Sequence, residues 1–173
     1  MTNLFVYFGI ALGVSFLCSI LEAALLSITP SHLAKLEQDR PRVGARLRTL
    51  KTRIDRPLAA ILSLNTIANT AGAAGVGAEA QRLWGSEALA IASAILTLSI
   101  LIVSEIIPKT LGAMYWRRMT RFISVVLPPM ILLMLPLVWL AEAVTRVLKR
   151  KRGAEKLSRE EFAALARVGE EQG

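Results

Sequence analysis

The stretch that decides the fold is SILIVSEIIPKTLGAMY, Ser99–Tyr115, in which charges and a proline interrupt an apolar run. A charge inside a hydrocarbon layer is costly, so Glu105 favours an ion or substrate pathway over a structural role. Pro108 lacks an N–H, which in a regular helix leaves the carbonyl of Ser104 without a donor. We expect a helix break there. Two purely structural interpretations stay open. Glu105 could pair with Lys109 one turn later, and Pro108 could only kink the helix.

The whole chain shares this apolar character. Of its 173 residues, 54% are hydrophobic, and the mean hydropathy is +0.51. That is too apolar for an ordinary soluble domain and favours a membrane protein. Four runs are about long enough to cross a hydrocarbon core of ~30 Å: residues 4–28, 58–80, 88–107 and 122–147. The first run is too long for a signal peptide and no basic residue precedes it, so we favour a span over a cleaved leader.

Charge predicts the orientation. The formal charge of +8 lies beside the apolar runs, and without a nucleic-acid module it indicates the positive-inside bias of membrane proteins rather than nucleic-acid binding. Segment 31–56 carries eight Lys or Arg against three Asp or Glu, and its helical apolar spacing breaks at Pro41. We expect a basic helical hairpin on the anionic cytoplasmic surface. The N-terminus then lies outside and the C-terminus in the cytoplasm.

The predicted fold is an all-α membrane protein. Its transmembrane domain, residues 1–152, has three transmembrane helices at about 4–28, 58–80 and 88–112, plus the basic juxtamembrane helices. Segment 122–147 is flanked by basic residues on both sides and so leaves and returns on one face. Its prolines, Pro128, Pro129 and Pro136, favour a re-entrant or belt segment that they break. A fourth span stays open as the alternative.

The C-terminal part, residues 153–173, is polar and acidic. Ser158 and Glu161 match a capping box ahead of an apolar pattern, which predicts an amphipathic cytoplasmic helix. Because the sequence stops soon afterwards, we expect a further domain to be missing.

Three spans contribute candidate ion ligands. Asn65 and Asn69 are four residues apart, so their amides share a helix face, although such amides often only join helices. Glu22 shares a face with two serines of the first span, although it could also pair with a basic residue near the surface. The predicted metal ligands are Ser19, Asn65, Asn69, Ser104 and Glu105. Candidates for Na⁺ or for the pathway are Glu22, Ser15 and Ser63.

The chemistry of this set is that of hard oxygen atoms. Hydroxyl, amide, carbonyl and carboxylate oxygens suit Mg²⁺, Ca²⁺ or Na⁺ and argue against Cu⁺ or Zn²⁺. Cys18 and His32 stand alone in the sequence and form no zinc motif. No nucleophile and base come together in a recognisable pattern, so we do not expect an enzyme.

Four segments, in order, resemble one family. SEIIPKT resembles the GEIIPK signature of the CNNM/CorC magnesium transporters, and SILEAALLS resembles their SxxE segment. LNTIANT resembles their GNxxxN segment, and LSREEFAALARVGEEQG resembles the acidic helix before their CBS-domain pair. Two usual glycines are replaced, by Leu64 and by Ser104. The bulk of Leu64 puts close backbone approach at that point in doubt, whereas Ser104 can still contribute a carbonyl.

The resemblance implies a homodimeric domain in the cell (inner) membrane, with three spans and a juxtamembrane belt. It implies secondary-active Mg²⁺ export coupled to Na⁺ entry, with the predicted ligands as its ion site. It also implies cytoplasmic CBS domains that bind ATP–Mg²⁺ and are missing here. Two other functions stay open: a Mg²⁺-sensing membrane scaffold and a Mg²⁺ channel.

Overall fold

The computed structural model describes residues 1–151, all within or between helices. The helices are α1 (Thr2–Ser27), α2 (Pro30–Asp39), α3 (Pro41–Thr52), α4 (Asp55–Trp84), α5 (Ser86–Ser99), the π-helix η1 (Ile100–Ile106), α6 (Ile107–Leu133) and α7 (Leu135–Lys151). The described residues contain no strand. The all-α prediction is therefore confirmed, whereas the predicted helix over 153–173 lies outside the described residues.

Three helical stretches are long and apolar enough to cross a membrane: Thr2–Ser27, Asp55–Trp84 and Ser86–Leu133. The first two are α1 and α4, and the third joins α5, η1 and α6 without a gap. Three candidate spans agree with the predicted number. Residues Met1–Trp139 form one compact unit, and a second unit begins at Leu140.

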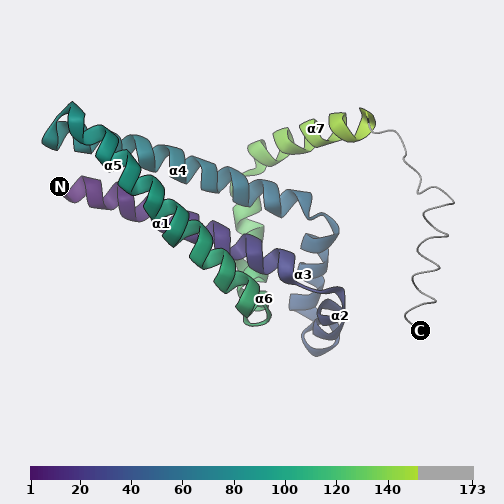
Figure 1. Ribbon diagram of the computed structural model, residues 1–173. Coiled ribbons are helices and arrows are strands. Elements are labelled where there is room, and N and C mark those ends of the chain that lie inside the picture. The colour runs from purple at the N-terminus through teal and green to yellow at the C-terminus, as the bar shows by residue number, and fades with distance from the viewer. Residues whose placement is uncertain (152–173) are drawn as a thin grey trace, which may run out of the picture. The chain divides into compact units, whose positions relative to one another are not determined.

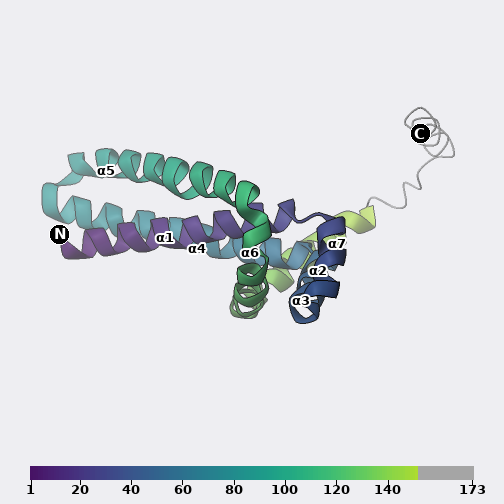
Figure 2. The ribbon, with the colours of Figure 1, turned by 90° about the horizontal axis from the view of Figure 1, so that it is seen from below.

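Within the first unit, α1 is the helix that the other spans share. It packs against α4, η1 and α6, and Figures 1 and 2 show it alongside α4 and crossed by the α5–α6 stretch. Glycines make these contacts close. A Cβ on Gly72 of α4 would lie 2.3 Å from the Cβ of Ala11, and one on Gly112 of α6 would lie 2.6 Å from the carbonyl oxygen of Ile20. The small residues of the segment 71–77 thus let α1 approach α4 closely.

The basic segment forms the expected helical hairpin. Helices α2 and α3 pack together and meet at Arg40, just before Pro41. A bidentate ion pair between Arg48 and Glu37 links the two helices, and Gly44 lies against the Glu37 backbone.

The hairpin is buried against the end of the spans. Leu47 of α3 is fully buried in one apolar cluster with Leu21 and Leu25 of α1 and with Ile123 and Leu127 of α6. The ring of His32 in α2 also lies edge-on to Trp116 of α6, with ring centroids 4.8 Å apart. The hairpin is therefore packed onto the membrane unit and is part of its core.

Of the three predicted proline breaks in 122–147, only the one near Pro136 is found, and whether this stretch is a re-entrant or belt segment or a fourth span stays a prediction. Pro128 and Pro129 lie inside α6, which continues to Leu133. The backbone departs from helical geometry at Tyr115 (φ −107°, ψ 15°) and again at Met134 (φ −94°, ψ 12°), just before Pro136. Two prolines remove only two helical hydrogen bonds, and burial of the neighbouring Leu127 and Met130 holds this part of α6 in place.

Candidate ion site between α1, α4 and η1

The close contacts set the depth of each helix relative to α1. Ala11 faces Gly72 and Asn3 bonds to Glu79, so α4 runs antiparallel to α1. On the other side, the hydroxyl of Ser104 donates to the carbonyl of Leu12 at 3.0 Å, and further along Gly112 meets Ile20. Helices η1 and α6 thus run parallel to α1.

This register places the predicted ligands at shared depths. Four residues beyond Ala11, Ser15 comes level with about residue 68 of α4, next to Asn69. One residue beyond the Ser104–Leu12 contact, Glu105 lies at the level of about residue 13. At 1.5 Å per residue, Ser15, Asn69 and Glu105 differ in depth by only about 3 Å. Ser19 and Asn65 come level with each other by the same count, about one turn away.

Three oxygens at these levels are buried and unpartnered. Among the described residues, the Oγ atoms of Ser15 and Ser19 and the Oδ1 atom of Asn69 accept and donate no hydrogen bond. Ser15 is 0% exposed and Ser19 is 1% exposed. The Nδ2 of Asn69 is 3.5 Å from the Oδ1 of Asn65, so the two amides do share a face. Buried polar atoms without partners are unusual and indicate a ligand or water.

Glu105 lies at the depth of Ser15 and Asn69 and forms no ion pair with any described residue. It is half-buried on η1, and no described residue forms a hydrogen bond or salt bridge with its carboxylate. The expected partner, Lys109, lies instead 3.5 Å from Glu22 of α1. The alternative in which Lys109 neutralises Glu105 is therefore wrong, and the alternative in which Glu22 pairs with a basic residue is confirmed.

The chain does not leave the helix at Pro108, but its regular α-helical hydrogen bonding is interrupted in the residues before the proline. The chain stays helical by widening into seven π-helical residues before the proline, and the N–H of Ile107 bonds to the carbonyl of Ile102, five residues back. Counted in that register, the carbonyl opposite Pro108 belongs to Val103 and no longer to Ser104. A π segment inside a helix is rare and often marks a functional site.

Ser104 itself is held by packing. Its side chain is fully buried, and its hydroxyl donates a hydrogen bond to the carbonyl of Leu12. Only its backbone carbonyl is therefore left to act on an ion. Ser63, a pathway candidate on α4, is half-buried and lies two residues, about half a turn, before Asn65 toward the hairpin.

The sequence-based search missed two features of this region. It did not pair Glu22 with Lys109, because the contact depends on the parallel register of α1 and α6. It also did not single out Gly112, whose only signal was a small residue in an apolar span, next to the SEIIPK stretch. Within residues 1–151 there is no group of three or more His, Cys, Asp and Glu that could hold a metal.

Comparison with known proteins agrees with this architecture. Residues 7–173 match the family described as the Cyclin M (CNNM) transmembrane N-terminal domain. The chain is 33% identical to a UPF0053 protein of Synechocystis over 96% of its own length and 48% of the relative's. It is 30% identical to the UPF0053 inner membrane protein YfjD of Escherichia coli (83% and 35%) and 32% identical to a UPF0053 protein of Haemophilus influenzae (86% and 35%).

The chain thus spans about half of the length of the first relative and about a third of the other two. Three candidate spans, the helical hairpin and the match over nearly every residue lead to one conclusion. This chain belongs to the CNNM transmembrane-domain family.

Proposed function

We propose that this membrane protein is a secondary-active Mg²⁺ transporter that exports Mg²⁺ in exchange for Na⁺. The observation that carries the proposal is the set of buried, unpartnered oxygens of Ser15 and Asn69 at the depth of the unpaired Glu105, with the unpartnered oxygen of Ser19 about one turn away. A cation would supply the missing partner for each of them. An intramembrane carboxylate without a counter-charge is otherwise hard to account for.

The ligand count suits a releasable Mg²⁺ site. Mg²⁺ requires about six oxygens at ~2.1 Å and usually keeps several waters. Ser19, Asn65, Asn69, Glu105 and the Ser104 carbonyl supply protein oxygens, and Ser15 adds a hydroxyl at the same depth. With one carboxylate, the occupied site keeps a net positive charge. Such a site binds weakly enough to release the ion, as transport requires.

The Glu22–Lys109 pair suggests how a second cation could be coupled. The pair is partly exposed, with 37% of the Glu22 side chain and 48% of the Lys109 side chain accessible. A Na⁺ ion that binds the Glu22 carboxylate would compete with the Lys109 ammonium and displace it. Because Lys109 follows η1 and Pro108 directly, this displacement would act on the helix that carries Glu105.

The first test is Mg²⁺ binding to the purified protein by calorimetry, followed by Mg²⁺ flux in sealed vesicles with and without a Na⁺ gradient. Glu105→Gln keeps the shape of the side chain and removes its charge. We expect it to abolish saturable binding and flux. Glu87→Gln, which removes a carboxylate from the exposed first turn of α5, is the matched control and should behave as wild type.

The outcomes separate the competing functions. Full flux in Glu105→Gln would disprove the site. Binding without flux would favour a Mg²⁺-sensing scaffold, and flux that ignores Na⁺ would favour a channel.

We further propose that the protein is a homodimer in the cell membrane with its N-terminus outside, and that CBS domains follow in a longer chain. The shorter length of this chain relative to its relatives is compatible with that proposal.

A further inference from the structure

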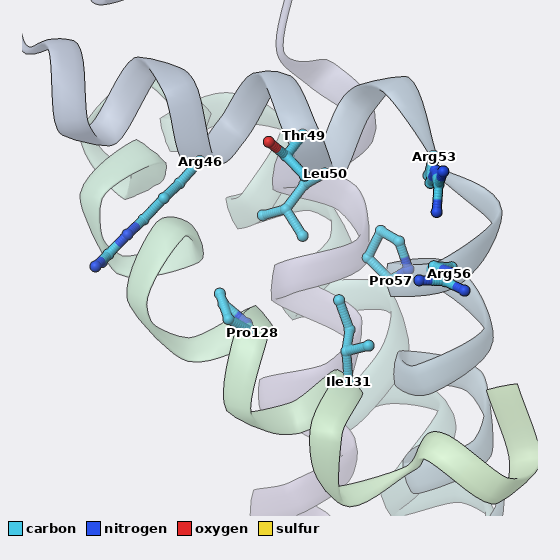
Figure 3. Close-up of a pocket in the computed structure, with 8 residues that line it drawn as sticks. All are labelled: Arg46, Thr49, Leu50, Arg53, Arg56, Pro57, Pro128 and Ile131. Atoms are coloured by element: carbon cyan, nitrogen blue, oxygen red, sulfur yellow. The ribbon is translucent and has the colours of Figure 1, made fainter.

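A cavity of about 390 Å³ opens where the hairpin meets the spans. Its walls come from three elements: α3, the beginning of α4, and the part of α6 beyond the kink. Figure 3 shows arginines on two sides and an apolar strip between them. The lining residues are Arg46, Thr49, Leu50, Arg53, Arg56, Pro57, Pro128 and Ile131.

The charge of this cavity is positive and only partly compensated. Among the described residues, neither Arg46 nor Arg53 forms a salt bridge or side-chain hydrogen bond. The acidic side chain of Glu37, on the same hairpin, pairs with Arg48. Arg56 takes part in an interaction within the chain, so the positive charge available to a ligand rests on Arg46 and Arg53.

The place of the cavity fits the edge of a bilayer. Pro57 lies in the first turn of the candidate span Asp55–Trp84, whereas Arg46 and Thr49 belong to the basic hairpin outside it. With Pro57 at the beginning of that span, the apolar strip of Leu50, Pro128 and Ile131 would face the hydrocarbon layer and the guanidinium groups would lie at headgroup level. A ligand that fits both must carry an anionic group joined to an apolar part.

We propose that this cavity binds the phosphate headgroup of an anionic phospholipid. Guanidinium groups bind phosphate oxygens in bidentate fashion, and basic pockets beside membrane helices on the cytoplasmic side select anionic headgroups. The volume lies in the range of small-ligand sites, about 300–1,000 Å³. It accommodates the phosphate and glycerol, while the acyl chains extend along the apolar strip. The bound lipid would join α3, α4 and α6, and this binding does not depend on ion transport.

The experiment is a titration of the purified 173-residue chain in detergent, with bound lipid counted by native mass spectrometry. The probes are phosphatidylglycerol, phosphatidylcholine and inorganic phosphate. The test variant is Arg46→Gln/Arg53→Gln. The matched control is Arg40→Gln/Arg42→Gln, which removes the same charge from the same hairpin but does not line the cavity. A third variant, Thr49→Trp, fills the cavity and keeps every charge.

We expect wild type to bind phosphatidylglycerol in preference to phosphatidylcholine, and the test variant to bind it on the order of tenfold more weakly. Thr49→Trp should weaken binding in the same way, and the control should not. Equal losses in the test and control variants would overturn the cavity in favour of diffuse surface attraction. Inorganic phosphate that binds as tightly as the lipid would overturn the lipid assignment. A circular-dichroism melt of each variant identifies losses caused by unfolding.

Discussion

The side chain of Ser104 makes a contact between two helices. Its hydroxyl bonds to the Leu12 carbonyl across the α1–η1 contact. Ser104→Ala should lower the free energy of unfolding by about 0.5–1.5 kcal/mol and leave Mg²⁺ binding intact, because the carbonyl remains. Denaturation and calorimetry measure the two effects. Ser99→Ala is the control, since its hydroxyl bonds only within its own helix, to Ile95. Loss of binding in Ser104→Ala at unchanged stability would contradict this division.

At this scale the sequence predicted types of residue better than partners. Glu105, Asn65 and Asn69 stand out because a polar group in an apolar run is rare, and the structure places Asn69 and Glu105 at one depth. The partner of Lys109 could not be predicted, because i,i+4 spacing favours Glu105 and only the helix register brings Glu22 closer. Whether these residues bind Mg²⁺ stays a prediction.

At the scale of the helices, close packing depends on single glycines. A Cβ at Gly72 would lie 2.3 Å from that of Ala11, so Gly72→Ala must separate α1 from α4. We expect a loss of about 1–3 kcal/mol in the free energy of unfolding. Gly13→Ala is the control, because nothing lies within 4 Å of its Cβ. The double variant Gly72→Ala/Ala11→Gly exchanges the two sizes and should recover much of the loss. If the double variant did not recover stability, the distance between α1 and α4 would be set by contacts other than Gly72–Ala11.

The hairpin gives a prediction about pH. The hydrogen bonds from Arg48 hold the pKa of the Glu37 carboxyl below its ordinary value of 4.5. A lowered pKa in the folded state means that the ion pair stabilises the hairpin above this ordinary value and that the stabilisation is lost as the pH falls below it. Glu37→Gln should therefore lower the melting temperature at about pH 7 and much less at about pH 3.5.

Asp39→Asn is the control for that experiment, because Asp39 forms no salt bridge among the described residues. It should show little effect at either pH. A Glu37→Gln effect that is the same at both pH values would mean that the side chain acts through packing alone.

Helix existence was predictable and helix continuity was not. Apolar length identified the spans, and Pro41 correctly marked the hairpin turn. The same rule failed at Pro108 and Pro128, because tertiary packing and a π-helical register keep the chain helical there. The kink at Tyr115 carries no glycine or proline, so local sequence gave no signal for it.

At the scale of the whole molecule, charge predicts that the α4–α5 turn lies outside and the hairpin inside. The chain has one cysteine, Cys18, so a Cys18→Ala background allows single labels at Ser86→Cys and Lys35→Cys. Both positions are exposed. We expect an impermeant maleimide to label Ser86→Cys in intact cells and Lys35→Cys only after lysis. The reverse pattern would overturn the orientation.

The family was recognisable from SEIIPK and the ordered accompanying segments, and the match over residues 7–173 agrees. The cavity where the basic hairpin meets the spans could not be recognised from the sequence, because its walls come from three separate stretches of the chain. Distances between helices are set by packing of side chains that no local pattern encodes.

The π-helix has one more consequence, which concerns insertions and deletions. A π segment of this kind accommodates one extra amino acid in an α-helix by widening the turn. Removing one residue from Ile100–Ile106 would let the segment return to a regular α-helix. Because the wider turn already absorbs the extra residue, α5 and α6 would keep nearly the same orientation relative to each other, with α1 still in contact at Gly112. Relatives that are one residue shorter in this stretch would thus share the arrangement of the flanking helices and differ in the local geometry around Glu105.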